Sequence, residues 1–393
     1  KPFIKIITGL RRSGKSTILR LLKEELSVRA DEEHIVYLNL EDFEFTAGFD
    51  AAQLNALVME RITDKKTHYI LLDEIQIVPG WERVVNSLFA SKPVDIYITG
   101  SNSRLLSSEL ATLLAGRYVE ILVRTLSFAE YLDFKKETTG EAPKNIHGAV
   151  WEYIERGGFP AVHIANIDRE TARRVVKDIY ASVLLRDTIQ RYKIRNIDFL
   201  ERLLRFLFDN TGNLFSAKSI TDYIKNLKHT IDVETIYNYI NALESAFIIK
   251  KAPRYDIKGK EFLNFREKYY PGDISLTYAA LGFDLKRISG ILETIIFTEL
   301  ERRGFSVYVG KLNEQEVDFV GLRGTEKIYV QAAYLLGDNR ETIEREFGPL
   351  KRIDDNFPKY VVTLDERWSD SIDGIRWLHL ADFLLGDGNR EHY

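Results

Sequence analysis

The stretch "GLRRSGKST" (Gly9–Thr17) has the glycine, lysine and serine spacing of a phosphate-binding loop. The apolar run Phe3–Thr8 directly before it predicts a buried parallel strand. After it, isoleucine and leucine recur at helical spacing, which predicts a helix that begins near Ser16. A strand, a glycine loop and a helix in this order are the context that the motif requires. The sequence therefore predicts a nucleotide-phosphate site near the start of the chain.

The residue types in this loop fit phosphate chemistry. Gly9 and Gly14 permit backbone turns that other residues avoid, so the loop amides and the helix N-terminus can face a phosphate. We expect Lys15 to reach the β and γ phosphates of a nucleoside triphosphate, and the Ser16 hydroxyl to ligate Mg²⁺. The predicted nucleotide-binding residues are Gly9, Arg12, Ser13, Gly14, Lys15, Ser16 and Thr17.

A second apolar strand, "HYILLDEIQ" (His68–Gln76), ends in two acidic residues. Asp73 falls where a strand would present a carboxylate to the magnesium ion, and Glu74 is placed to polarise an attacking water. A strand that ends in a solvated acidic turn is the alternative. Beside a phosphate-binding loop, we favour the catalytic interpretation.

A third strand, "VDIYITGSNS" (Val94–Ser103), ends in polar residues, and Asn102 or Ser101 is a candidate sensor of the γ-phosphate. A hydrogen-bonded turn explains these residues equally well. Arg117 precedes the next predicted strand, and it or Arg104 is a candidate for offsetting transition-state charge; a plain surface arginine is the alternative. The predicted catalytic set is Lys15, Glu74, Asn102 and Arg117, and the predicted metal ligands are Ser16 and Asp73.

These motifs together resemble the AAA+-type P-loop ATPases of bacteria and archaea that carry an uncharacterised C-terminal domain. The motifs "YILLDEIQ", "ITGSNSRLLSSELATLLAGRYVE", "LSFAEYL", "ERGGFPAV", "LLRDTIQRYKI" and "QEVDFVG" follow the glycine loop in the order of that family. The resemblance implies a core of five parallel strands, ATP as the nucleotide, and Mg²⁺. It also implies Lys15 and Ser16 at the phosphates, Asp73 at the magnesium ion and Glu74 as the water-activating acid.

The middle of the chain is expected to be helical and to include a helix-turn-helix with a β-wing. The outward face of the second helix carries Glu234, Thr235, Asn238, Asn241 and Glu244, and two acids there suit a phosphate backbone poorly. The wing is basic, and DNA is a candidate partner through Lys250, Lys251, Arg254, Lys258 and Lys260. A protein-interaction module is the alternative. Arg186 and Asp187 lie near the nucleotide or pair in a helix interface, which we favour.

The end of the chain has the pattern of a restriction-type nuclease. Glu293 within an amphipathic helix and Asp318 in a following strand are placed to bind a metal ion. The third strand offers Gln331 and then Ala333, where this chemistry needs a lysine, since residues two apart share a strand face. We therefore predict a nuclease-like domain that has lost catalysis.

Composition limits the remaining functions. The 393 residues carry a net charge of −4 and no cysteine, which excludes disulfides and thiol chemistry. No apolar run approaches the ~20 residues of a membrane span and no signal peptide is evident, so we expect a cytoplasmic protein without membrane contact. The sequence opens at Lys1 rather than Met, and we expect a native segment before it.

The fold class expected is α/β in three parts. An AAA+-like ATP-binding domain occupies residues 1–140, a helical and winged-helix segment 141–265, and an inactive nuclease-like α/β domain 266–393. The predicted function is Mg²⁺-dependent ATP hydrolysis that couples nucleotide state to an unknown protein partner, with an oligomer as one arrangement. The alternatives are a DNA-binding ATPase that uses the wing, and a slow nucleotide-controlled switch without motor activity.

Overall fold

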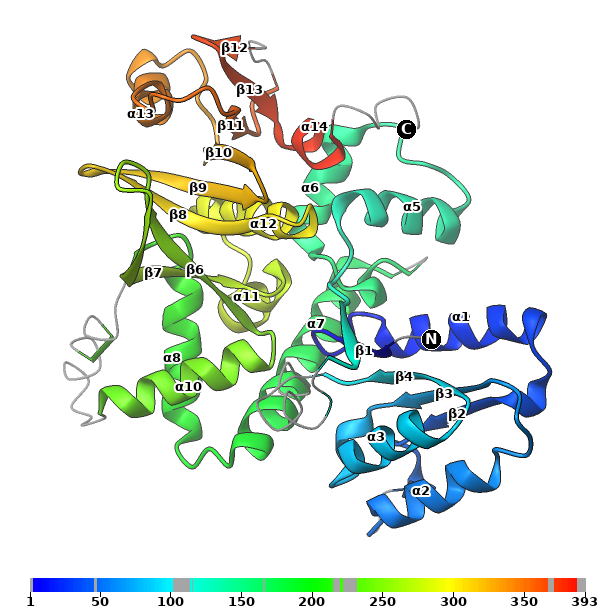
Figure 1. Cartoon of the computed structure of the whole chain (residues 1–393). Coiled ribbons are helices and arrows are strands. Elements are labelled where there is room, and N and C mark those ends of the chain that lie inside the picture. The colour runs from blue at the N-terminus through cyan, green and yellow to red at the C-terminus, as the bar shows by residue number, and fades with distance from the viewer. Residues whose placement is uncertain are drawn as a thin grey trace. The chain divides into compact units, whose positions relative to one another are not determined.

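The computed structural model describes residues 3–45, 48–101, 114, 116–164, 167–214, 220–221, 232–366 and 371–386 (Figure 1). The chain divides into two compact units, Lys1–Thr125 with Ser245–Phe247 and Leu126–Glu244 with Ile248–Tyr393. This differs from the three expected parts. The expected boundary at 140 follows helix α5 (Phe128–Thr139), and the one at 265 falls inside strand β7 (Glu261–Pro271). One apolar cluster spans both boundaries, because its members run from Phe128 to Leu385.

The described residues of the first unit form a parallel five-stranded sheet of order β2-β3-β4-β1-β5, as expected for a P-loop core. Its strands are β1 (Ile4–Thr8), β2 (Ile35–Asn39), β3 (His68–Asp73), β4 (Val94–Thr99) and β5 (Tyr118–Leu122). Its helices are α1 (Lys15–Arg29), α2 (Ala51–Glu60) and α3 (Trp81–Ser91), with short 3₁₀ turns at Glu32–His34, Phe43–Phe45 and Ile75–Ile77.

Alternation along the strands explains the layers of this unit. In β1, Ile6 joins the apolar cluster that includes α2 and α3, whereas its neighbour Ile7 packs with Leu19 and Leu26 of α1. Successive strand residues point to opposite faces, so a strand that is apolar on both faces needs helices on both. Figure 1 shows α1 on one face of the sheet and α2 and α3 on the other.

The second unit joins helices to a mixed sheet. Its helical segments are α5, α6 (Ile146–Arg156), 3₁₀ turn Pro160–Val162, α7 (Arg169–Ser182), π-helical segment Val183–Gln190, α8 (Ile197–Asp209), α10 (Val233–Ser245), α11 (Ile274–Leu281), 3₁₀ turn Leu285–Arg287, α12 (Ile288–Arg302), α13 (Arg340–Lys351) and α14 (Leu380–Leu385). Its strands are β6 (Ile249–Asp256), β7, β8 (Ser306–Leu312), β9 (Gln315–Arg323), β10 (Glu326–Ala332), β11 (Lys359–Thr363), β12 (Ser371–Ile372) and β13 (Ile375–His379). No helix in these described ranges, or in those of the first unit, is long and apolar enough to cross a membrane.

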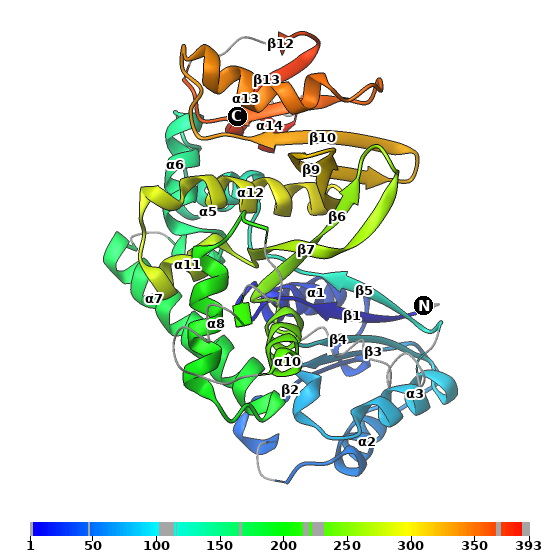
Figure 2. The same cartoon turned by 90° about the vertical axis from the view of Figure 1, so that its left-hand side faces the viewer.

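In the described ranges of this unit, eight strands pair in the order β12-β13-β11-β10-β9-β8-β6-β7. Neighbouring residues Tyr329 and Val330 of β10 belong to two different apolar clusters, which include α13 and α12 respectively. The sheet is therefore covered on both faces, and Figure 2 shows β9 and β10 between α12 and α13.

The hairpin expected as a basic wing belongs to this sheet. Strand β6 pairs antiparallel with β7 and parallel with β8, where Arg254 lies opposite Val309. The buried residues of β6 are Ile249, Ala252 and Tyr255, and Ala252 is fully buried. The winged-helix expectation is therefore wrong for this hairpin, since a wing projects from its domain rather than extending a larger sheet.

A buried lysine lies among acidic side chains beneath α12. The Nζ atom of Lys268 in β7 is 2.7 Å from a Glu316 carboxylate oxygen, 3.1 Å from Glu293 and 3.7 Å from Asp318. The Tyr270 hydroxyl donates to Glu293 at 2.8 Å. Glu293 and Asp318 thus lie in one cluster, as the nuclease-like pattern predicted, but its lysine comes from β7. Gln331 instead donates to Glu346 of α13.

The charges in this cluster depend on one another. Burial alone would lower the pKa of Lys268, but the charges of Glu293, Asp318 and Glu316 outweigh burial and raise it. Burial, helped by the Glu293 charge, raises the pKa of Asp318 well above its ordinary value. The Lys268 ammonium therefore compensates carboxylates that would otherwise be buried at high cost.

Replacing Lys268 with methionine keeps the length of the side chain but removes this compensation. We expect Lys268→Met to lower the free energy of unfolding by roughly 3–5 kcal/mol, because it leaves buried carboxylates unpaired. Urea unfolding measures this loss. Lys258→Met, at an exposed position of the same hairpin, is the control and should change stability by less than about 0.5 kcal/mol. Equal stability of the two variants would contradict the compensating role.

A buried histidine makes the second unit sensitive to acid. Burial lowers the pKa of His163 from 6.5 to about 4, and its Nε2 atom lies 2.7 Å from the Gly157 carbonyl oxygen. Between these two pKa values the unfolded chain binds a proton that the folded chain does not. The stability contributed by neutral His163 is therefore complete above pH 6.5 and is lost as the pH falls toward 4.

We expect the free energy of unfolding to decrease by on the order of 3 kcal/mol through this window for His163 alone. His163→Gln keeps a donor for Gly157 but cannot titrate, so its stability should change less between neutral pH and the middle of the window. Urea unfolding at both pH values gives the comparison. His379, whose pKa burial also lowers to about 4, should leave a residual slope in the variant. If the free energy of unfolding of His163→Gln depends on pH as strongly as that of the unchanged protein, His163 is not the source of the acid sensitivity.

Candidate nucleotide-binding site

The glycine loop joins the end of β1 to the start of α1, as the sequence predicted. Gly9 has a φ of +139°, and a Cβ atom there would lie 2.0 Å from the Val123 carbonyl oxygen, so no other residue fits. Gly14 has a φ of +106° and precedes α1, whose first turn receives no hydrogen bond from a side-chain cap. The first amides of α1 are therefore available to an anion at the helix N-terminus.

Lys15 lies in the loop with its ammonium turned inward. The side chain is buried, and Nζ donates to the carbonyl oxygens of Gly9 at 2.9 Å and Leu10 at 3.0 Å. The Ser13 hydroxyl is buried and has no hydrogen-bond partner within the described part of the chain. Arg12 adopts a left-handed conformation at a φ of 67° and is exposed, as is Thr17. The loop thus combines two glycines with positive φ angles, a buried ammonium group and a buried hydroxyl group without a hydrogen-bond partner among the described residues. This combination fits a phosphate group.

Asp73 ends β3 and receives hydrogen bonds from three hydroxyl groups. Ser16 Oγ donates to Oδ1 at 3.1 Å, Thr99 Oγ1 donates to the same oxygen, and Tyr37 donates to Oδ2 at 3.3 Å. The predicted metal ligands Ser16 and Asp73 are therefore adjacent. Oxygen donors of this kind suit Mg²⁺, which keeps several waters and takes few protein ligands.

Glu74 follows Asp73 in a left-handed conformation, at a φ of 54°. Its N–H donates to Thr99 Oγ1 at 2.9 Å, and its carboxylate accepts a hydrogen bond from Gln76. Burial raises the pKa of Glu74, while the nearby Lys15 charge opposes that shift. A buried carboxylate on a strained turn next to the predicted metal ligands is typical of a group that accepts a proton in catalysis.

Thr99 was missed by sequence reasoning, which favoured the polar residues after it. Its hydroxyl contacts both Asp73 and the Glu74 backbone, so it is the side chain that connects the two acids. The signal was available, because Thr99 is the polar last residue of a largely apolar strand that lies between β3 and β1. Ser101 is buried near this edge, and Asn102 and Arg104 lie outside the described residues.

Arg11 and Glu41 form a second contact that the sequence did not suggest. Arg11 Nη2 lies 2.5 Å from Glu41 Oε1, and both charges affect the pKa of Glu74. Glu41 lies two residues after the end of β2. The parallel sheet therefore brings it to the same edge as the glycine loop. Arg11 occupies a variable position of the loop motif, and Glu41 lies outside the motif.

Arg117 does not reach the site of its own chain. It precedes β5, whose Tyr118 pairs with Ile4 at the start of β1, and its Nη1 donates to Asn86 at 2.6 Å. Parallel strands begin at one edge and end at the other, and the glycine loop follows the end of β1. Arg117 therefore lies at the edge of the sheet away from the glycine loop. The expectation that it completes the site of its own chain is wrong.

The second unit contains the other residues that the sequence analysis singled out for nucleotide or DNA contacts. Asp187 is buried on the π-helical segment, 4.0 Å from Arg191, whereas Arg186 is exposed. Lys250 forms an ion pair with Glu301 of α12, which reduces the positive charge of the predicted DNA-binding set. Lys251, Lys258 and Lys260 are exposed and Arg254 is half-buried. On α10, Glu234, Asn238 and Asn241 are exposed, Thr235 is half-buried, and burial raises the pKa of Glu244.

Comparison with known proteins supports a P-loop fold for the first unit. The family model of an AAA domain matches residues 1–132, and a model described as a domain of unknown function matches residues 148–287. The solved structure of the Walker-type ATPase PABY2304 of Pyrococcus abyssi has a TM-score of 0.51 and 16% identity, and the match covers 70% of this chain and 90% of that one. This likeness shows the P-loop fold.

Two relatives extend the match over most of the chain. An uncharacterized protein of Haemophilus influenzae is 38% identical over 385 residues, which cover 98% of this chain and 94% of that protein. The uncharacterized protein MJ1544 of Methanocaldococcus jannaschii is 31% identical over 355 residues, covering 87% and 77%. The chain therefore belongs with these relatives to a family of bacterial and archaeal P-loop ATPases in which a domain of unknown function follows the AAA domain.

Proposed function

We propose that this protein binds ATP with Mg²⁺, hydrolyses it slowly, and couples its nucleotide state to the binding of a partner. The observation that carries the proposal is the meeting of Lys15, Ser16, Asp73, Glu74 and Thr99 at one edge of the sheet. Each side chain has the chemistry for one part of phosphoryl transfer, in which positioning and charge stabilisation dominate.

The roles follow from the contacts. Lys15 would exchange its bonds to the Gly9 and Leu10 carbonyls for bonds to phosphate oxygens, which repays the burial of its charge. Ser16 and Asp73 would hold Mg²⁺, which when bound neutralises charge on the phosphates. Glu74, with its raised pKa, would orient a water and accept its proton. Thr99 would hold Asp73 and the Glu74 backbone in place.

The contact between Gln76 and Glu74 favours the switch among the alternatives. Because Gln76 donates to one oxygen of the Glu74 carboxylate, the position of Gln76 affects how that carboxylate orients a water. A partner that moves Gln76 would therefore change the rate of turnover. The second unit supports coupling, since it has its own core and supplies none of the five residues.

The nuclease-like sheet is proposed to be inactive. Lys268 lies within 3.7 Å of both Glu293 and Asp318, so an ammonium takes the position between the acids where a metal ion would bind. Ala333, the expected site of a lysine, packs in the apolar layer with α13. The basic hairpin is a weaker candidate for DNA binding than the sequence indicated, because it extends a sheet and Lys250 is paired with Glu301.

Removal of the loop lysine tests nucleotide binding. We expect Lys15→Ala to weaken ATP binding by at least roughly 100-fold, since several charge-assisted hydrogen bonds to phosphate are lost. Titration of a fluorescent ATP analogue measures the affinity. Arg29→Ala removes one positive charge from the exposed end of the same helix and is the matched control. If both variants bind as the unchanged protein does, Lys15 does not contact the nucleotide.

Removal of the proposed base tests hydrolysis separately from binding. We expect Glu74→Gln to keep the ATP affinity within a few-fold and to reduce turnover by roughly 10²–10⁴-fold, because a positioned general base supplies that factor. Steady-state phosphate release with Mg²⁺, and with EDTA as a blank, gives the rate. Glu24→Gln, on the exposed face of α1, should retain the full rate.

Normal hydrolysis by Glu74→Gln would show that another group activates the water. Duplex DNA added to the unchanged protein separates the remaining alternatives. A rate that is slow and indifferent to DNA agrees with the switch, whereas stimulation by DNA would revive the DNA-binding ATPase and direct attention to the exposed lysines of the β6–β7 hairpin.

A further inference from the structure

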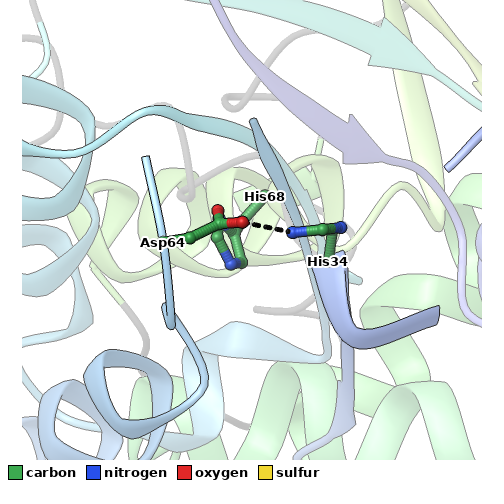
Figure 3. Close-up of side chains that lie close together, drawn as sticks. All are labelled: His34, Asp64 and His68. Atoms are coloured by element: carbon green, nitrogen blue, oxygen red, sulfur yellow. Dashed lines mark hydrogen bonds and ion pairs between the residues drawn. The ribbon is translucent and has the colours of Figure 1, made fainter. Parts of the chain in front are cut away.

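Two buried histidines and an aspartate meet at the edge of the first sheet that lies away from the glycine loop. His34 directly precedes β2, and His68 is the first residue of β3. These strands are parallel and pair Ile35 with Tyr69, so their preceding residues are neighbours. Asp64 lies in the connection between α2 and β3. Figure 3 shows the three side chains together, with Asp64 beside both rings.

The ligand atoms are close enough for one metal ion. One ring nitrogen of each histidine and a carboxylate oxygen of Asp64 lie within 4.8 Å of one another. His34 Nε2 is 3.1 Å from Asp64 Oδ2, and the two rings meet edge to face with centroids 4.9 Å apart. A tetrahedral zinc ion with bonds of about 2.0–2.2 Å needs ligand atoms about 3.4 Å apart. Small side-chain rotations would therefore complete the geometry.

His68 provides an independent sign of a ligand. Its side chain is fully buried, and its Nε2 atom has no hydrogen-bond partner among the described residues. Its Nδ1 atom lies 3.0 Å from the Lys66 carbonyl oxygen, so Nδ1 carries the proton and donates it there. This tautomer leaves a lone pair on Nε2, as in metal-binding histidines whose other nitrogen donates to a backbone carbonyl. A buried nitrogen without a partner costs free energy unless something binds it.

Two further carboxylates lie next to His34, and one of them, Asp31, also pairs with Lys66, whose Nζ atom is 3.5 Å from Asp31 Oδ2. Asp31 Oδ2 lies 3.6 Å from His34 Nδ1, and Glu33 Oε1 lies 3.9 Å from His34 Nε2. A carboxylate behind a metal-binding histidine orients the ring and raises its basicity. Asp64 is exposed, whereas both histidines are buried, so the side of the cluster next to Asp64 is open to a water as fourth ligand.

We propose that His34, Asp64 and His68 form a binding site for a zinc-class transition metal ion, separate from the nucleotide site. Two imidazoles and one carboxylate suit zinc rather than magnesium or calcium, which prefer oxygen ligands alone. The ion would tie the connection after α2 to the first residues of β2 and β3. It therefore stabilises the edge of the sheet opposite the phosphate cradle.

Zinc titration of the metal-free protein tests the proposal. After treatment with EDTA and its removal, calorimetric titration with ZnCl₂ alone should give one ion per chain, and MgCl₂ should give no binding at this site. Zinc should also raise the thermal unfolding midpoint. Asp64→Asn, a change at an exposed position, should weaken zinc binding by at least roughly tenfold, and His68→Gln by at least as much.

Glu60→Gln is the matched control, because it removes an exposed negative charge four residues before Asp64 without touching the cluster. It should bind zinc as the unchanged protein does. ATP affinity, measured on each variant, verifies that the first unit is folded. Absence of stoichiometric zinc binding, or equal binding by Asp64→Asn, His68→Gln and Glu60→Gln, would overturn the proposal and leave only a hydrogen bond between His34 and Asp64.

Discussion

The carboxylate of Asp73 is the point on which the nucleotide site depends. It is almost fully buried and accepts hydrogen bonds from Ser16, Tyr37 and Thr99, which belong to α1, β2 and β4. A buried carboxylate needs such donors to offset the loss of water. In return, the carboxylate holds three separate elements in register at the edge where the parallel strands end. The phosphate cradle, the metal ligands and the proposed base all share this edge.

Two neighbouring acids have different environments there. Asp73 is surrounded by hydroxyl donors, whereas Glu74 turns through a left-handed conformation and contacts Gln76. This difference suits one residue for a metal ion and the other for proton transfer. Because Thr99 contacts both residues, a movement of β4 would reach the two acids together, which gives a physical route by which a partner could influence turnover.

The second unit depends on a different buried charge. Lys268 joins β7, α12 and β9 through its contacts with Glu293, Glu316 and Asp318. The two acids predicted from the nuclease-like pattern, Glu293 and Asp318, thus both face the same ammonium group. The same lysine explains why the β6–β7 hairpin is part of the sheet rather than a free wing, since Tyr270 and Lys268 both turn toward α12.

The sequence by itself predicted four strands of the first sheet and the roles open to Gly9, Lys15, Ser16, Asp73 and Glu74, because these depend on local spacing and on hydrophobic runs. The fifth strand, β2, was expected only from the family resemblance. Only the tertiary structure decided the rest. Thr99 and Lys268 act through partners 25 or more residues away. Strand direction keeps Arg117 away from the site of its own chain, and the basic hairpin pairs with the distant strand β8. Short-range patterns record backbone conformation and burial, whereas the pairing of strands and the meeting of buried charges depend on residues far apart along the chain.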